Sequence, residues 1–259
     1  MQKQPIGIFD SGVGGTSIWK AINALLPYEN TIYLADSINA PYGPKGKDAI
    51  IHLSKKNTEY LLNKNCKLIV VACNTATTNA IDYLRKTYNV PFVGIEPAIK
   101  PAALKTKTNT IGILATKGTL SSALFSKTSN LFASHIKVIE QEGEGIVQLI
   151  EQGELYSEKM KALLKTYLNP MIDANIDYLV LGCTHYPYLM PLLINILPKH
   201  VTIIDSGEAV ARQTKTILEK NNLLNNQNIT PKLQFYTNGN RNVILSLLGN
   251  NYTVEELKF

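Results

Sequence analysis

The chain has 259 residues, which is long enough for one large domain or two smaller ones. Hydrophobic residues make up 45% and charged residues 18%, as in soluble globular proteins. The formal net charge is +6, but the lysines are scattered and form no basic run, so acidic substrates are favoured over a nucleic-acid partner. The three cysteines are an odd number without tight spacing, which argues against a disulfide framework and fits a reducing cytosol.

The sequence also argues against a membrane or secreted protein. No stretch approaches the length of a membrane span, and the first residues lack the apolar stretch of a signal peptide. We therefore expect a cytoplasmic protein with no membrane partner. No CxxC motif or His-rich pair indicates a zinc site, so we expect no metal.

Residues 6–9 are predicted to form the first strand, followed by a glycine-rich turn at 10–17 and a helix to about residue 26. The glycines permit close backbone approach, and helix-terminal N–H groups can hold an anion. The pattern approaches a dinucleotide fingerprint, but it has Ser17 where the third glycine belongs. NAD is therefore not favoured, although Asp36 follows the second predicted strand where a ribose ligand would lie. An ordinary turn at Asp10-Ser11 is the simpler alternative.

The rest of the chain alternates predicted strands and helices, which indicates βαβ units and a mainly parallel sheet. Further strands are predicted at residues 31–35, 68–72, 91–95, 110–115, 136–140, 178–182, 201–204 and 233–236. Helices are predicted at residues 47–63, 75–87, 158–168, 208–220 and 240–248, with loops at 39–46 and 221–228. The strand-then-turn pattern restarts near Thr110, which predicts two similar α/β halves that enclose a shared cleft.

Cys73 and Cys183 each end a short apolar run, so each is expected just past the carboxyl end of a buried strand. Ligands of open α/β sheets bind there, and a following helix N-terminus would favour a thiolate. A lone cysteine in such a place is more often a small buried hydrophobe. The matched settings instead indicate a pair of thiols acting as base and acid.

The neighbours of these two cysteines support that interpretation. Polar residues that a structural cysteine does not need follow both of them, namely Asn74, Thr75, Thr184 and His185. His185 lies two residues from Cys183 and is predicted to handle a proton. Cys66 precedes its strand and is interpreted as structural, and His52, His135 and His200 receive no role.

Four sequence motifs resemble those of a known protein family, and the resemblance extends from about residue 6 to the C-terminus. They are residues 9–15 (FDSGVGG), 41–43 (PYG), 72–76 (ACNTA) and 182–187 (GCTHYP). In this order they resemble the cofactor-independent aspartate/glutamate racemase family, and its glutamate racemases in particular. The resemblance implies two similar α/β domains with mainly parallel sheets flanked by helices and an active site in the cleft between them. We place the first domain at residues 1–97 plus 208–259 and the second at 98–207.

The resemblance also implies a chemistry. It is the interconversion of L- and D-glutamate without a cofactor or metal, which supplies D-glutamate for peptidoglycan. Cys73 and Cys183 would be the acid/base pair, with Asp10 and His185 as the auxiliaries beside the two thiols. The residues implied to contact glutamate are Asp10, Ser11, Tyr42, Gly43, Asn74, Thr75, Thr184 and His185. Asp36 and Glu151 match further acidic positions of the family.

Some features depart from the family, and other functions stay open. Ala35 and Asn39 stand where many members have glycine and a basic residue, which puts loop contacts in doubt. The sequence lacks the N-terminal extension that some members use for activation by a cell-wall precursor, so we expect no activator dependence. Homodimers are common in the family. An aspartate or hydantoin racemase, a two-lobed binding protein and a charge-based nucleic-acid role are the competing hypotheses.

Overall fold

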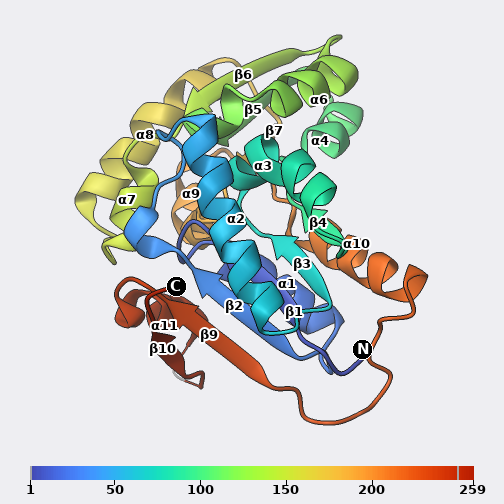
Figure 1. The fold of residues 1–259 in the computed structure, drawn as a ribbon. Helices are drawn as coiled ribbons and strands as arrows, with labels where there is room; N and C mark the ends of the chain where they lie inside the picture. Colours follow the sequence, from blue (N-terminus) through green and yellow to red (C-terminus); the bar gives the residue numbers. More distant parts are fainter. Residues whose placement is uncertain (1, 250) are drawn as a thin grey trace.

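The computed structural model describes residues 2–249 and 251–259 as an α/β protein with two parallel sheets (Figure 1). The first sheet has the strand order β10-β9-β2-β1-β3-β4 and the second has the order β6-β5-β7-β8. Every neighbouring pair is parallel. The strands are β1 (Ile6–Asp10), β2 (Thr31–Ala35), β3 (Leu68–Val71), β4 (Phe92–Gly94), β5 (Thr110–Ala115), β6 (Lys137–Glu142), β7 (Tyr178–Gly182), β8 (Thr202–Ile204), β9 (Leu233–Thr237) and β10 (Val254–Glu256).

The second sheet repeats the topology of the first. Its order β6-β5-β7-β8 corresponds to β2-β1-β3-β4, so β5 takes the place of β1 and β7 takes the place of β3. The restart near Thr110 therefore begins a second half of the same kind, and the predicted two-sheet α/β architecture is confirmed. Cys73 follows β3 and Cys183 follows β7, so the two cysteines occupy topologically equivalent positions.

Helices cover both faces of the first sheet (Figure 1). The helices are α1 (Thr16–Leu25), α2 (Lys47–Asn63), α3 (Asn74–Thr87), α4 (Ile99–Lys105), α5 (Lys117–Leu120), α6 (Ala123–Ala133), α7 (Ile146–Glu151), α8 (Glu158–Asp173), α9 (Met190–Ile196), α10 (Gly207–Lys220) and α11 (Arg241–Leu248), with 3₁₀ turns η1 (Ser37–Asn39) and η2 (Tyr186–Leu189). Side chains alternate across a strand, so β1 serves two cores. Ile6 and Ile8 pack with Trp19 of α1, whereas Phe9 packs with Ala80 of α3 on the opposite face.

The two halves share one of these cores. The cluster that contains Ile8 and Trp19 of the first half continues to Ile146 of α7 and Leu181 of β7 in the second half. Burial of apolar surface from both sheets in one cluster stabilises the position of one sheet relative to the other. The carboxyl ends of β1, β3 and β7 are thereby fixed relative to one another.

The chain crosses between the sheets twice. It leaves the first sheet after β4, at residue 94, and returns after β8, at residue 204. Ser206 in the returning segment donates its hydroxyl to the backbone carbonyl of Glu96 in the outgoing one. The boundaries placed between residues 97 and 98 and between 207 and 208 fall in these crossings and stay a prediction.

Several elements were not predicted from the sequence. Helix α6 was missed, and so were the seven-residue helices α4 and α9, which contain Pro101 and Pro191 and so give a weaker helical signal. Helix α8 continues past residue 168, the predicted end, to Asp173. Strand β10 has only three residues and pairs at the edge of the first sheet with β9. Such short elements are set by tertiary packing more than by local pattern.

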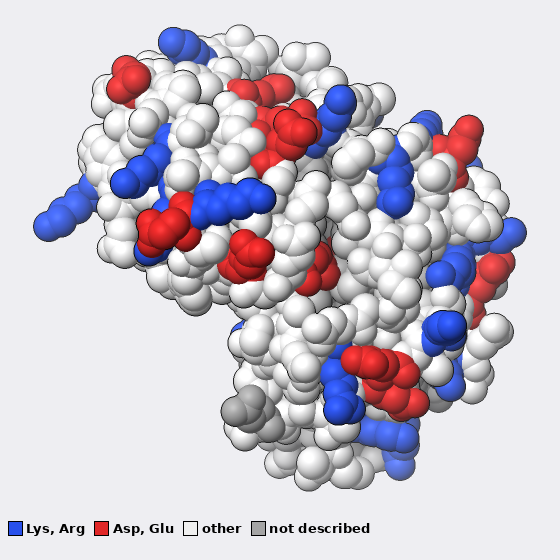
Figure 2. Space-filling model, turned by 90° about the vertical axis from the view of Figure 1, so that its left-hand side faces the viewer, with Lys and Arg blue, Asp and Glu red and all other residues white. Residues whose placement is uncertain are grey.

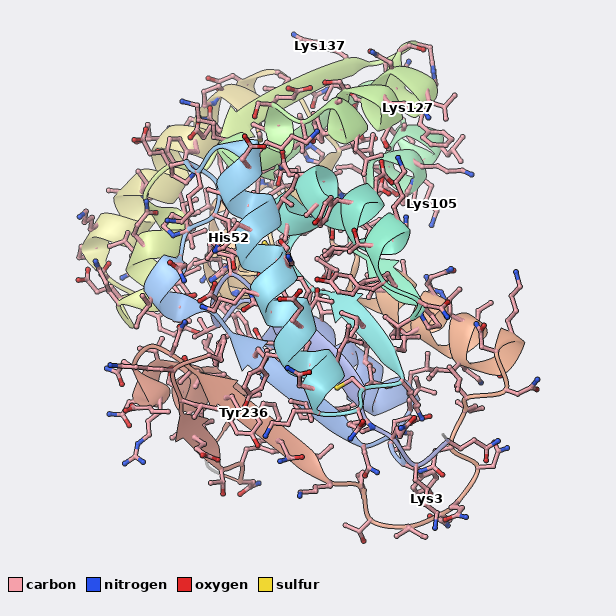
Figure 3. All side chains as sticks on the ribbon, in the orientation of Figure 1. Lys3, His52, Lys105, Lys127, Lys137 and Tyr236 are labelled. Carbon is pink, nitrogen blue, oxygen red and sulfur yellow. The ribbon has the colours of Figure 1, made fainter. Side chains whose placement is uncertain are left out.

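The surface agrees with the scattered charge seen in the sequence. Lysine and arginine side chains alternate with aspartate and glutamate over the face in Figure 2. Lys3 and Lys137 lie at opposite ends of the molecule, and His52 lies on α2 (Figure 3). Within the described residues, none of the helices is both long and apolar enough to span a bilayer.

Candidate active site

Cys73 and Cys183 line one tight pocket. Both side chains are buried, with 4% and 7% of their surface exposed. The other residues around this pocket are Ser11, Pro41, Tyr42, Gly43, Asn74, Thr75, Thr116, Val147, Thr184 and His185. Its free space is about 10 Å³, far below the range typical of sites for drug-sized ligands. The structure thus brings together the residues that the sequence predicted around the two cysteines.

Asp10, at the end of β1, lies behind this lining and organises the glycine turn. Its carboxylate accepts hydrogen bonds from the backbone N–H of Ser11 at 2.7 Å and of Gly15 at 2.6 Å. The hydroxyl of Thr184 donates to the same carboxylate at 3.2 Å, which ties the turn to the segment after β7. Burial raises the pKa of Asp10, against the opposing effects of His185 and the Gly15 N–H. Asp10 therefore positions the residues on both sides of the pocket.

The glycines of this turn admit side chains of the other half of the protein. A Cβ atom on Gly12 would lie 1.8 Å from Oε1 of Glu151, and one on Gly14 would lie 2.2 Å from Nδ1 of His185. The backbone N–H of Val13 donates to Glu151 Oε1 at 2.7 Å. The turn does bind an anion, as its sequence indicated, but that anion is the protein's own Glu151. The glycines are required here because any larger residue would displace Glu151 or His185.

Glu151, His185 and Cys183 form a chain of polar contacts. Nε2 of His185 donates to Glu151 Oε1 at 2.6 Å, and its Nδ1 lies 3.7 Å from the Cys183 sulfur. Burial alone would lower the pKa of His185, but the hydrogen bonds to Cys183 and Glu151 outweigh it and hold the pKa well above its ordinary value. A histidine protonated on both nitrogens can donate to the carboxylate and to the sulfur at once. His185 therefore faces Cys183 as a proton donor.

Cys73 has a different environment. It is the N-cap of α3, and its sulfur accepts the backbone N–H of Ala76 at 3.4 Å while its thiol lies 3.6 Å from the Ser11 hydroxyl oxygen. A helix N-terminus favours thiolate, which was the expectation from the sequence. Here burial, and then the charge of Asp10, raise the pKa of Cys73 well above its ordinary value. Burial therefore favours the thiol form of Cys73, against the effect of the helix N-terminus.

The expectation that a helix follows each cysteine holds only for the first. Cys73 is followed directly by the 14 residues of α3. Cys183 is followed by Thr184 and His185 and then by the 3₁₀ turn η2, which contains Pro187. Pro187 lies in the first turn of η2, where the missing backbone N–H of proline is tolerated. His185, and not a long helix, supplies the polar partner of Cys183.

Hydrogen-bonding groups that lack a protein partner face the pocket. Asn74 is 2% exposed, and neither atom of its amide has a hydrogen-bond partner among the described residues. A buried amide without partners costs free energy of about 1–3 kcal/mol, so such groups are normally completed by a ligand or water. Thr75 lies 2.8 Å from Thr116 between their hydroxyl oxygens, across the two halves. These neutral groups can bind carboxylate oxygens or an ammonium group.

Asp36 supports the wall of the pocket that contains Tyr42. The Tyr42 hydroxyl donates to the fully buried Asp36 carboxylate at 2.5 Å. Burial, with the nearby charge of Asp36, holds the pKa of Tyr42 well above its ordinary value, so the hydroxyl keeps its proton. Asn39, which stands where a basic residue was expected, donates to the same carboxylate at 2.8 Å. Asp36 does not line the pocket and is committed to protein partners, which leaves no ribose ligand there.

Pro41, Thr116 and Val147 are lining residues that sequence reasoning missed. Thr116 is the first residue after β5, as Ser11 is the first residue after β1. The repeat of strand and turn in the sequence could therefore have identified Thr116. Val147 lies in the first turn of α7 and carried no chemical signal in the sequence. Shape around a pocket is provided by apolar residues of this kind, whose position depends on long-range packing.

Comparison with known proteins places this geometry in a family. The family model described as Asp/Glu/Hydantoin racemase matches residues 6–214. The chain belongs to this racemase family. A glutamate racemase of Herpetosiphon aurantiacus is 45% identical over 239 residues, which are 92% of this chain and 94% of that protein. The resemblance seen in the sequence motifs is thereby confirmed.

Solved structures of relatives agree with the fold of this racemase. Glutamate racemase of Francisella tularensis subsp. tularensis, solved in complex with D-glutamate, is 29% identical with a TM-score of 0.85, over 100% of this chain and 98% of that one. Glutamate racemase of Escherichia coli, solved with L-glutamate and the activator UDP-MurNAc-ala, is 32% identical with a TM-score of 0.87, over 98% of each chain. The two-sheet arrangement is thus that of these enzymes.

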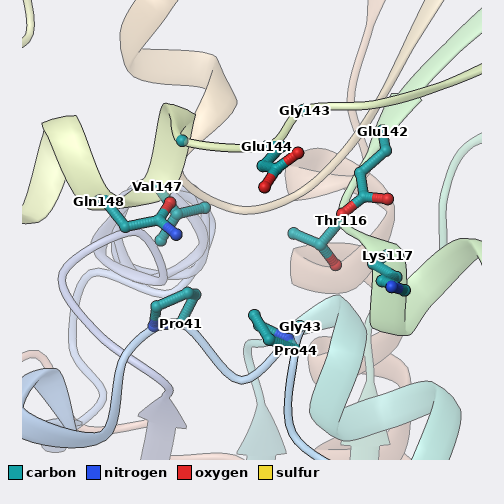
Figure 4. Close-up of a pocket in the computed structure, with 11 residues that line it drawn as sticks. Pro41, Gly43, Pro44, Thr116, Lys117, Glu142, Gly143, Glu144, Val147 and Gln148 are labelled. Carbon is teal, nitrogen blue, oxygen red and sulfur yellow. The ribbon is translucent and has the colours of Figure 1, made fainter.

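A larger pocket of about 140 Å³ adjoins the cysteine pocket of the racemase. Pro41, Gly43, Thr116 and Val147 line both, so the two spaces meet at these residues. In Figure 4, Pro41, Gly43 and Pro44 form one wall, and Lys117, Glu142 and Glu144 lie on the other. This outer pocket forms an approach to the thiols that is polar and carries both signs of charge.

The third cysteine lies apart from the site. Cys66 precedes β3, at the opposite end of that strand from Cys73, and is 6% exposed. Burial raises the pKa of Cys66 to about 12, so it is an inert thiol near neutral pH. All three cysteines are free. Among the described residues, the structure contains no group of three or more His, Cys, Asp or Glu side chains arranged to hold a metal ion.

Proposed function

We propose that this racemase interconverts L- and D-glutamate by proton transfer at the α-carbon, with Cys73 and Cys183 as the two acid/base groups. The observation that carries the proposal is that two thiols from topologically equivalent strand ends line one small pocket. The relatives named glutamate racemase, and the complexes of two of them with glutamate enantiomers, support the choice of substrate.

The proposed reaction inverts one carbon centre. A thiolate removes the α-proton from one face, the electron pair left on the α-carbon is delocalised into the adjacent carboxylate, and the other thiol delivers its proton to the opposite face. As the family resemblance implies, Cys183 deprotonates L-glutamate and Cys73 deprotonates D-glutamate. The raised pKa of Cys73 supports this assignment for the direction from L to D, because that direction needs Cys73 as the acid.

The auxiliary groups are proposed to act on the thiols from the two sides. His185, protonated and held by Glu151, donates to the Cys183 sulfur and stabilises the negative charge that develops there. Asp10 lies next to Ser11, which contacts Cys73, and its charge keeps the proton on Cys73 until the substrate carbanion needs it. The two thiols thus have opposite electrostatic surroundings, which suits opposite roles.

The substrate is proposed to be held by neutral groups. Glutamate carries two carboxylates and one ammonium group, and the N-terminus of α3 offers backbone N–H groups beside the unpartnered Asn74 amide. Thr75, Thr184 and the backbone of Tyr42-Gly43 complete the proposed contacts. Neutral donors bind a carboxylate without neutralising the thiolate that must attack beside it.

The wider role follows the resemblance. We propose that the D-glutamate product supplies peptidoglycan synthesis in the cytoplasm, where free thiols persist. A homodimer is a further proposal, and so are the two domains at residues 1–97 plus 208–259 and 98–207.

The test is circular dichroism of purified protein with L-glutamate and no added cofactor. The signal should decay to zero as the racemic mixture forms, and it should do the same from D-glutamate. L-aspartate and a substituted hydantoin are the comparison substrates. Faster turnover of either than of glutamate would contradict the substrate assignment, and binding of glutamate without loss of signal would favour a binding protein.

A further inference from the structure

A buried network connects the pocket to the C-terminal part of the chain. The carboxylate of Asp36 accepts three side-chain hydrogen bonds, from Tyr42 at 2.5 Å, from Asn39 at 2.8 Å and from the amide of Asn238 at 2.6 Å. Asn238 is 202 positions away from Asp36 in the sequence. It directly follows β9, which pairs with β2 in register at Ala35 and Thr237.

The network ends at a side chain that lines the pocket. Tyr42 is 1% exposed and lies between Pro41 and Gly43, which also line the pocket with both cysteines. Its hydroxyl donates to Asp36 and accepts from the Asn57 amide at 3.1 Å. The hydroxyl is therefore engaged by protein groups on two sides, and these groups set the position of this wall of the pocket.

Asn238 contacts the start of this loop in three ways. Its Nδ2 donates to Asp36 Oδ1, its Oδ1 accepts the backbone N–H of Ile38 at 3.0 Å, and its own N–H donates to the Ala35 carbonyl at 3.3 Å. An amide side chain carries both a donor, its NH₂ group, and an acceptor, its carbonyl oxygen. Neither a carboxylate nor an apolar side chain of similar size offers both.

We propose that Asn238 is a positioning residue for the reaction, which holds Asp36 and, through it, Tyr42 and the Pro41–Gly43 wall of the pocket. The inference rests on the proposed function, because it assigns this wall to substrate binding. A residue of the C-terminal segment thereby determines the affinity for substrate without contacting it.

The experiment compares steady-state kinetics of Asn238→Ala, Tyr42→Phe and the double variant with those of the wild type. Asn238→Ala should raise KM for glutamate by about tenfold with kcat within about twofold, the change expected when one hydrogen bond to a charged group is lost from a binding wall. Tyr42→Phe removes the hydroxyl through which Asp36 acts. The double variant should therefore be no worse than Tyr42→Phe alone.

Asn240→Ala is the matched control. Asn240 lies two residues further on, and its side chain accepts the N–H of Asn242 as the N-cap of α11. Its loss should lower the melting temperature and leave KM unchanged. Asn238→Asp is a second variant of native shape, which keeps the acceptor for Ile38 but sets a carboxylate against Asp36. It should raise KM at least as much as Asn238→Ala does.

Three results would overturn the inference. Wild-type KM in Asn238→Asp or Asn238→Ala would show that the contact does not position the wall. Effects of Asn238→Ala and Tyr42→Phe that multiply in the double variant would show that Asn238 acts elsewhere. If the wild type racemises glutamate and one of the first two results is found, only the role of Asn238 is contradicted. If the wild type does not racemise glutamate, the proposed function fails and this inference fails with it.

Discussion

Replacing Glu151 by glutamine removes one charge from the site and preserves its shape. Oε1 of Glu151 accepts both hydrogen bonds, from Val13 N–H at 2.7 Å and from His185 Nε2 at 2.6 Å, and the glutamine oxygen can accept the same two. The bond from Val13 becomes a bond between neutral groups, whereas the bond from His185 keeps the charge of its donor. A hydrogen bond to a charged group contributes about 1.5–3 kcal/mol and a neutral one about 0.5–1.5 kcal/mol, so the expected loss is about 1–1.5 kcal/mol. This corresponds to about tenfold in kcat/KM.

The same substitution should shift the pH dependence. Glu151 is one of the groups that raise the pKa of His185, so glutamine should lower that pKa toward its ordinary value. Activity that needs protonated His185 should then be lost at lower pH than in the wild type. A raised histidine pKa contributes stability fully below the unfolded pKa, about 6.5, and loses it as pH rises through the folded pKa. The stability difference between wild type and variant should therefore be largest at low pH.

The assay is circular dichroism in both directions across pH, with thermal unfolding at the same pH values. Enantiomers have equal free energy in water, so kcat/KM must fall equally for L- and D-glutamate, which checks the data internally. Glu154→Gln is the control, since it removes the same charge from an exposed position three residues away. Superimposable pH profiles of wild type and Glu151→Gln would refute the reasoning, because His185 would then not depend on Glu151.

Further predictions concern the cofactor, Asp10 and the glycine turn. Turnover should survive dialysis against a chelator, and the protein should show no pyridoxal absorbance; restoration of activity by a metal or by pyridoxal phosphate would contradict the thiol mechanism. Asp10→Asn should lower kcat more than it raises KM, by about 10²–10⁴-fold, and an unchanged kcat would return Asp10 to a purely structural role. Gly14→Ala should displace His185 and destabilise the fold by about 1–3 kcal/mol, as measured by denaturant unfolding. Gly46→Ala, whose Cβ would meet nothing within 4 Å, is its control and should leave activity intact.

Local pattern was sufficient for the sheets and for most of the pocket. The apolar runs that end at Cys73 and Cys183 are buried parallel strands, because strands covered on both faces lack polar alternation. The restart near Thr110 identified the second half, since equivalent strands need equivalent sequence. The polar residues after each cysteine line the pocket because the ends of the equivalent strands in the two halves meet there.

Long-range contacts set the rest. The pairing of Glu151 with the Val13 N–H, and of Asn238 with Asp36, joins residues 138 and 202 positions apart, which no local pattern encodes. The raised pKa of Cys73 was also beyond the sequence, because the helix N-terminus was visible but the extent of burial was not. A helix terminus stabilises a charge by about 0.3–2 kcal/mol, which is less than the cost of full burial.

The most direct test of the two-thiol account is exchange of the α-hydrogen of glutamate with deuterated water in Cys73→Ser, Cys183→Ser and Cys66→Ser. Serine keeps the shape of cysteine but is a far weaker acid, so the first two variants should stay folded and lose racemisation, while Cys66→Ser should remain nearly as active as the wild type. Residual exchange should occur on L-glutamate in Cys73→Ser, where Cys183 remains, and on D-glutamate in Cys183→Ser. Racemisation at the wild-type rate by either the Cys73 or the Cys183 variant would contradict the account, because each direction of the reaction needs both thiols.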